Sequence, residues 1–111
     1  MIIIHMRRRA EGMELEAVGH AEHGAIGHDI VCAGVSAVLY GLAAYLEGQA
    51  AGCPTGRVDR TESSGRLCLR TRGLAGDETA FAVAAAGLGL IARAFPEAVR
   101  FISYEESKPF Q

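Results

Sequence analysis

Side chains capable of nucleophilic chemistry gather in residues 20–32. This segment holds three of the chain's four histidines together with one of its three cysteines, Cys32. The histidines are His20, His23 and His28. A thiolate is a strong nucleophile, and a neighbouring imidazole can take the thiol's proton or pair with the thiolate as a cation. The segment therefore indicates covalent catalysis by Cys32, with three candidate bases that spacing alone does not separate.

The start of a helix is expected just before Cys32. Asp29 is a favoured N-cap residue because its carboxylate accepts the unpaired N–H groups of the first turn. Cys32 would then be the third helical residue, near the positive end of the helix dipole, which favours the thiolate. The same N–H groups could hold an oxyanion. Asp29 could also orient an imidazole, and Ser36, one turn after Cys32, could hydrogen-bond the thiol, the histidine or the substrate.

The stretch from Ala21 to His28 is expected to be a loop. It contains Gly24 and Gly27 and has no hydrophobic periodicity, a pattern typical of loops. His20 comes at the end of the preceding strand. A flexible loop of this kind could bring its imidazole alongside Cys32.

Two other interpretations of the same residues stay open. A cysteine on an amphipathic helix is often a small buried apolar residue. The three histidines and Cys32 could instead be four zinc ligands, although the close pairs typical of structural zinc sites are absent, so neither a metal nor another cofactor is expected. Cys53 and Cys68 lie without a helix start or a histidine beside them. The odd cysteine count and the lack of a CxxC pair argue against a disulfide framework.

The elements that must position these residues can be predicted from periodicity. Alternating or β-branched apolar residues predict strands. Apolar residues at steps of three and four predict the first helix, and a run rich in alanine before Pro96 predicts the second, which gives the order ββαββαβ. The strands are expected over 2–6, 13–19, 57–60, 66–72 and 99–104, and the helices from Asp29 to 48–52 and from Asp77, as its cap, to about Ala94. The predicted fold is α+β, with two helices packed on a mainly antiparallel or mixed sheet. Strand order does not follow from the pattern.

Size and composition favour a single soluble domain covering residues 1–111. Half of the residues are hydrophobic and 22% are charged, which is typical of globular proteins. The net charge of −2 gives no bulk attraction to nucleic acid. No apolar run is expected to reach the length needed to cross a bilayer. Arg7 to Arg9 follow the first apolar residues, whereas a signal peptide has its charges first. We therefore expect a cytoplasmic protein that binds neither membrane nor nucleic acid directly.

The run from Gly19 to Ala37 resembles the signature of the ribosomal-processing cysteine protease family (Prp). That signature consists of Gly-His-Ala, a short glycine loop, Asp-Ile-Val-Cys-Ala and a serine one turn later, and each part occurs here. The resemblance implies that His20 is the catalytic histidine and Cys32 the nucleophile. It also implies that Gly19, Asp29 and Ser36 support them.

The same resemblance implies a function. Members of the family are homodimeric α+β endopeptidases that remove a short N-terminal extension from a bacterial large-subunit ribosomal protein, a step of ribosome biogenesis. The precursor of that protein is then the expected substrate, and an apolar groove is expected because the cleavage motif contains aromatic residues. The alternative is a non-catalytic ribosome-associated or protein-binding module whose thiol packs or senses oxidation.

Overall fold

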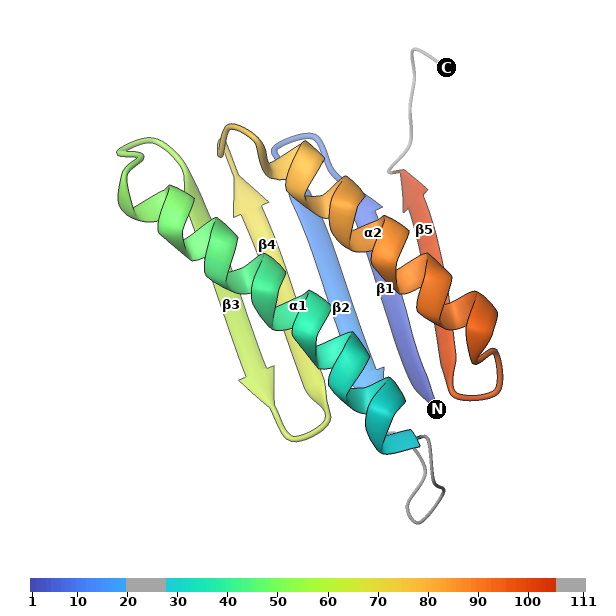
Figure 1. Cartoon of the computed structure of the whole chain (residues 1–111). Helices are drawn as coiled ribbons and strands as arrows, with labels where there is room; N and C mark the ends of the chain where they lie inside the picture. Colours follow the sequence, from blue (N-terminus) through green and yellow to red (C-terminus); the bar gives the residue numbers. More distant parts are fainter. Residues whose placement is uncertain (20–27, 106–111) are drawn as a thin grey trace.

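The computed structural model describes residues 1–19 and 28–105, which form one sheet covered on one face by two helices (Figure 1). The elements are β1 (Ile2–Arg8), β2 (Met13–Gly19), α1 (His28–Ala51), β3 (Arg57–Ser63), β4 (Arg66–Arg72), α2 (Asp77–Ala94) and β5 (Val99–Glu105). The predicted order ββαββαβ and the α+β class are both confirmed.

The sheet is mixed, with the strand order β3-β4-β2-β1-β5. Every neighbouring pair is antiparallel except β1 and β5, which run parallel. Ile2 on β1 lies opposite Gly19 on β2 and Val99 on β5. Because β2 also pairs with β4, the end of β2 at Gly19 meets the turn between β3 and β4. This end of the sheet lies beneath the start of α1 (Figure 1).

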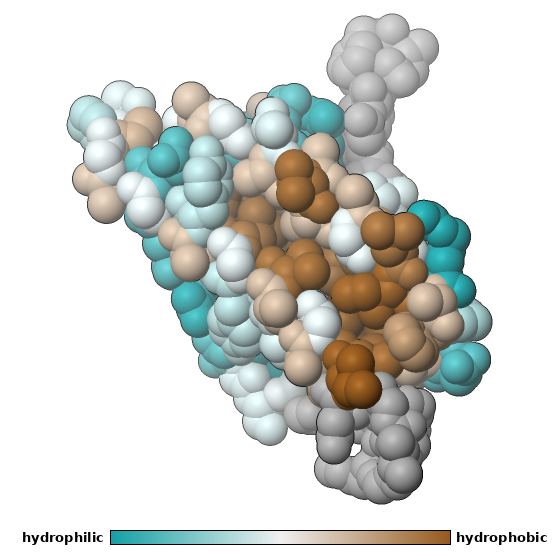
Figure 2. All heavy atoms as spheres, viewed as in Figure 1, coloured by the Kyte–Doolittle hydropathy of each residue, from teal (hydrophilic) through white to brown (hydrophobic). Residues whose placement is uncertain are grey.

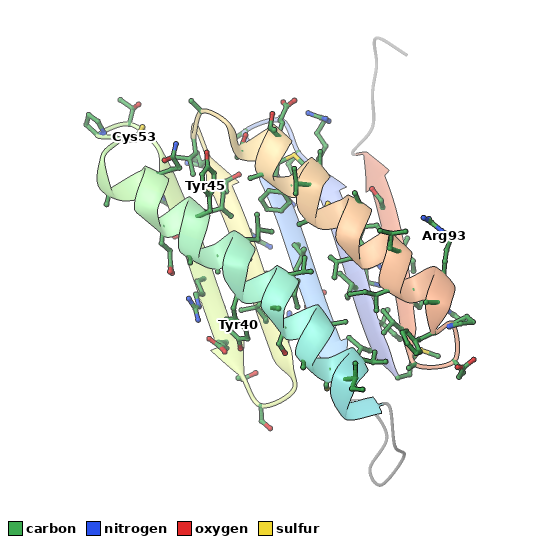
Figure 3. The ribbon with its side chains drawn as sticks, viewed as in Figure 1. Tyr40, Tyr45, Cys53 and Arg93 are labelled. Carbon is green, nitrogen blue, oxygen red and sulfur yellow. The ribbon has the colours of Figure 1, made fainter. Side chains whose placement is uncertain are left out.

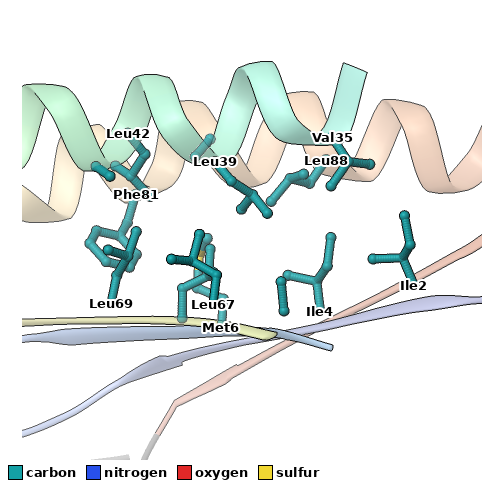
Figure 4. Packing of buried hydrophobic residues seen from close by; sticks show 14 of the residues in the cluster. Ile2, Ile4, Met6, Val35, Leu39, Leu42, Leu67, Leu69, Phe81 and Leu88 are labelled. Atoms are coloured by element: carbon teal, nitrogen blue, oxygen red, sulfur yellow. The ribbon is translucent and has the colours of Figure 1, made fainter. Parts of the chain in front are cut away.

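The core lies between the sheet and the two helices (Figure 4). Alternate residues of the strands point into it, as the period of two requires. Leu67 and Leu69 are buried, whereas Arg66 and Arg70 on the same strand are exposed, which confirms the predicted direction of β4. The largest fully buried side chains are Phe81, Ile4, Leu15, Leu46, Leu69 and Leu88.

Helix α1 is long and apolar enough to cross a membrane by length and composition, over Ile30–Ala51. The expectation that no stretch reaches that length was therefore wrong. The packing gives another reason for this composition. One face of α1, including Val31, Val35 and Leu46, is buried against the sheet. Further apolar side chains gather on the outer surface of both helices (Figure 2).

Both helices begin differently from the prediction. Helix α1 starts at His28, so Asp29 lies in the first turn rather than at the N-cap. Helix α2 is capped by Gly76 in the left-handed conformation, with φ 83°, and Asp77 makes no capping hydrogen bond. The Asp77 carboxylate is buried instead, where Oδ2 accepts a 2.6 Å hydrogen bond from the Thr71 hydroxyl. That hydroxyl also accepts from the Met13 N–H at 2.9 Å, so Asp77 joins α2 to the sheet instead of capping its own helix.

Candidate active site

A groove of about 210 Å³ lies between the start of α1 and the end of the sheet beneath it. One wall comes from α1 and contains Cys32, Val35, Ser36, Leu39 and Tyr40. The other side comes from the ends of β1, β2 and the β3–β4 turn, and contains Ile2, Ala17, Gly19, Ser63, Gly65, Arg66 and Leu67. The groove therefore joins segments that are distant in the sequence, and it has a mainly apolar floor.

Cys32 is half-buried and lines this groove, so its sulfur is not enclosed in the core. It is the fifth residue of α1 instead of the predicted third, because the helix begins at His28. Side chains on a helix point back toward its N-terminus, which directs the sulfur toward the first turn. The first four N–H groups of a helix have no partner within it. Donors suited to an oxyanion are thus close to the thiol.

The buried face of α1 fixes the direction of Cys32. Val31, Val35 and Leu39 are buried against the sheet, so the adjoining stripe of the helix faces the mouth of the groove. Cys32 and Ser36 share this stripe because they are four residues apart. Both line the groove, and Ser36 is exposed to solvent. The supporting role of Ser36 stays a prediction.

Gly19 closes the groove at the end of β2, and its conformation excludes a side chain. Its φ of 112° lies in the region that residues with a Cβ rarely adopt. A Cβ at this position would also overlap the carbonyl oxygen of Met1. The Gly19 N–H donates a 2.8 Å hydrogen bond to the Gly65 carbonyl in the β3–β4 turn. The backbone immediately before His20 is therefore held by neighbours on both sides.

The family model of the cysteine protease Prp matches residues 1–100. The chain belongs to the Prp family. A segment of 43 residues is 51% identical to the ribosomal processing cysteine protease Prp of Staphylococcus aureus, and this segment spans 37% of the chain and 41% of that relative. The match thus covers about two fifths of the curated relative's length.

Solved structures of Prp share the fold over nearly the whole chain. An essential ribosomal processing protease Prp from S. aureus, in complex with a substrate peptide, has a TM-score of 0.73 and 25% identity. The complex of that protease with a covalently linked product peptide has a TM-score of 0.72 and 26% identity. Each comparison covers 94% of this chain and 100% of the other. The predicted family and fold are confirmed.

The described part of this Prp chain brings together three of the predicted site residues, Gly19, Cys32 and Ser36. His20 follows Gly19 directly, but it lies outside the described residues, as do His23, Gly24 and Gly27. His28 and Asp29 are described only as backbone in the first turn of α1. The pairing of His20 with Cys32, and the loop that was expected to permit it, therefore stay predictions.

Sequence reasoning missed the remaining residues of the groove. Tyr40 lies eight residues after Cys32, and helical spacing could have placed it on the neighbouring surface of α1. The β3–β4 turn, with Ser63 and Arg66, carried no such signal because its place depends on the strand order. Arg66 forms an ion pair with Glu16 on β2, which holds the turn beside the groove.

The pKa values of the two other thiols of this Prp chain are shifted in opposite directions. A hydrogen bond with the Thr55 hydroxyl, at 3.8 Å, lowers the pKa of Cys53. Burial raises the pKa of Cys68, and the nearby Glu14 carboxylate acts in the same direction. Neither thiol lines the groove. In the described ranges, no group of three or more His, Cys, Asp or Glu residues could hold a metal ion.

Proposed function

We propose that this chain is a cytoplasmic cysteine endopeptidase that removes a short N-terminal extension from a bacterial large-subunit ribosomal protein. The observation that carries the proposal is the position of Cys32, which lies on an open groove near the start of α1, across from the glycine that precedes His20. The covalently linked product peptide and the substrate peptide in the S. aureus Prp structures support it.

The reaction uses Cys32 as nucleophile and His20 as base. His20 takes the thiol proton, and the thiolate sulfur forms a bond with the scissile carbonyl carbon. The oxyanion is held by N–H groups of the first turn of α1. The intermediate collapses when the C–N bond breaks and His20 returns its proton to the leaving amine, which leaves a thioester on Cys32. A water molecule deprotonated by His20 then hydrolyses the thioester and restores the thiol.

Cleavage of a peptide tests this proposal. The purified chain is incubated with a peptide that copies the N-terminus of the ribosomal protein from the same genome, and the products are followed by mass spectrometry. We expect two fragments from one cleavage site, and a scrambled peptide of equal composition should stay intact. Binding without cleavage would reject the protease and favour the non-catalytic module.

We also propose that the chain forms a homodimer, as the family resemblance implies, and that the outer surface of its helices forms the contact between the two copies. Apolar side chains on this surface are exposed, among them Tyr45 at 49%, Val83 at 70% and Leu90 at 61%. Tyr45 and Val83 line a hollow of about 640 Å³ between α1 and α2, and none of the described residues that line it is charged. Contiguous exposed apolar surface of this kind often marks a protein contact. A second copy would cover it.

Light scattering during size exclusion measures the assembly state. We expect a mass twice the chain's 11.7 kDa and the monomer mass for Val83→Asp, because burying an unpaired carboxylate at an apolar contact is costly. The control is Thr61→Asp. Thr61 is exposed on β3, away from the outer surface of the helices. A monomeric parent protein at micromolar concentration would contradict the proposal.

A further inference from the structure

Tyr40 belongs to the wall of the Cys32 groove and is held in place from β3 (Figure 3). Its hydroxyl donates a hydrogen bond to Glu62 Oε2. This bond raises the pKa of Tyr40 and lowers that of the Glu62 carboxyl. The Arg60 guanidinium carbon lies 5.3 Å from the centre of the Tyr40 ring, within the range of a cation–π contact. The ring is therefore restrained both at its hydroxyl and at its face.

Arg60 is itself fixed by two carboxylates. Its Nη1 lies 3.2 Å from Glu47 Oε1 on α1, and its Nη2 lies 3.2 Å from Glu62 Oε1 on β3. Each of these exposed contacts is weak alone, but together with Tyr40 they connect the helix to the edge strand. The arrangement restrains an aromatic side chain that is still 42% exposed. A restrained ring loses little conformational entropy when a ligand packs on it.

The part of the groove around Tyr40 suits an apolar side chain. Leu39 and Leu67 line the groove with it, and an aromatic ring adds a large apolar surface. Tyr40 lies eight residues after Cys32, and at a helical rise of about 1.5 Å per residue this places it about 12 Å along α1. An extended peptide covers about 3.3 Å per residue, so 12 Å corresponds to three or four peptide residues.

We infer that Tyr40 forms a specificity subsite for an apolar side chain that lies three or four residues from the scissile bond. The inference rests on the proposed peptidase function and adds to it the residue that selects the substrate at a distance from the thiol. Glu62 and Arg60 are positioning residues, because they act on the substrate only through the Tyr40 ring.

A series of variants and peptides tests the subsite. Tyr40→Ala should raise KM about tenfold with a smaller change in kcat, because it removes binding away from the reacting atoms. Tyr40→Phe keeps the ring and should retain most of the affinity. The control is Ile102→Ala, which shortens an exposed apolar side chain (36%) on β5, outside both the groove and the outer surface of the helices, and its KM should equal that of the parent protein.

Peptides in which each apolar residue is replaced in turn by alanine, on both sides of the scissile bond, then locate the contact. When the replaced residue lies three or four residues from the bond, the KM of the parent protein should rise about tenfold. The KM of Tyr40→Ala should not rise further, since the enzyme and peptide changes remove the same contact. Additive losses at every such position, or equal losses in Tyr40→Phe and Tyr40→Ala, would overturn the inference. A parent protein that cleaves no peptide would instead reject the proposed function.

Discussion

Replacing Cys32 with serine should reduce kcat/KM for the precursor peptide by about 10³-fold or more. The alcohol is far less acidic than the thiol, so an imidazole that serves the sulfur does not generate a comparable nucleophile. His20→Ala should lower kcat/KM by a similar factor. The double variant Cys32→Ser/His20→Ala should lower it only slightly more, because the two groups act as one unit. Initial rates measured by mass spectrometry, with circular dichroism to verify folding, check this result.

Cys68→Ser is the matched control for that experiment. Cys68 is also half-buried, but it lies on β4 with its side chain on the face of the sheet away from the helices. The Cys68→Ser variant should cleave the precursor peptide at the same rate as the parent protein. If Cys32→Ser or His20→Ala cleaved as fast as Cys68→Ser, the catalytic assignment would be wrong.

Alkylation gives an independent measure of the reactive thiol. Iodoacetamide should modify Cys32 well below pH 8 and leave Cys68, whose pKa is raised by burial, almost untouched. Cys53 has a lowered pKa and should also be modified early. Each site must therefore be identified by peptide mapping, since total thiol loss would combine Cys32 with Cys53.

Gly19→Ala should destabilise the fold and eliminate most of the activity. An alanine would have to adopt φ near 112° and would place its Cβ on the Met1 carbonyl oxygen. Backbone strain and overpacking each cost about 1–3 kcal/mol, so the free energy of unfolding should fall by roughly 2–6 kcal/mol. The end of β2 would move to relieve the overlap, and His20 follows it directly. Urea denaturation and kcat/KM measure the two effects.

Gly48→Ala is the comparison for Gly19→Ala, and it should change the free energy of unfolding in the opposite direction. Gly48 lies on the exposed side of α1, and nothing lies within 4 Å of a Cβ built on it. Alanine favours a helix over glycine by about 1 kcal/mol, so this variant should be slightly more stable and fully active. Equal stability of Gly19→Ala and the parent protein would show that the end of β2 adapts at no cost.

The fold was largely predictable because its elements follow local patterns. Alternation placed β2, β4 and β5, a β-branched run placed β1, and the hairpin pattern placed β3. Steps of three and four placed α1, whereas a run rich in alanine between Asp77 and Pro96 placed α2. The helix starts were less accurate. Asp77 has the right chemistry for a cap, but its carboxylate accepts a hydrogen bond from the Thr71 hydroxyl on β4 instead. The sequence around Asp77 does not indicate this partner from another element.

The site was predictable on its helical side and not on its sheet side. Cys32 and Ser36 share a stripe of α1 that spacing alone identifies. Gly65 enters the groove only because β4 pairs with β2, and no local pattern records that pairing. The choice of His20 over the other histidines came from the family resemblance, since the spacing of the residues did not distinguish them.

The parallel pairing of β1 with β5 joins two strands that are translated at very different times. Ile2, on the floor of the groove, donates its N–H to the Ala98 carbonyl at 2.8 Å. β1 thus gains its second neighbour only after β5 has been translated. Pairing between such distant segments is slow, so Cys32 is translated well before the pairing with β5 fixes Ile2 in the floor of the groove.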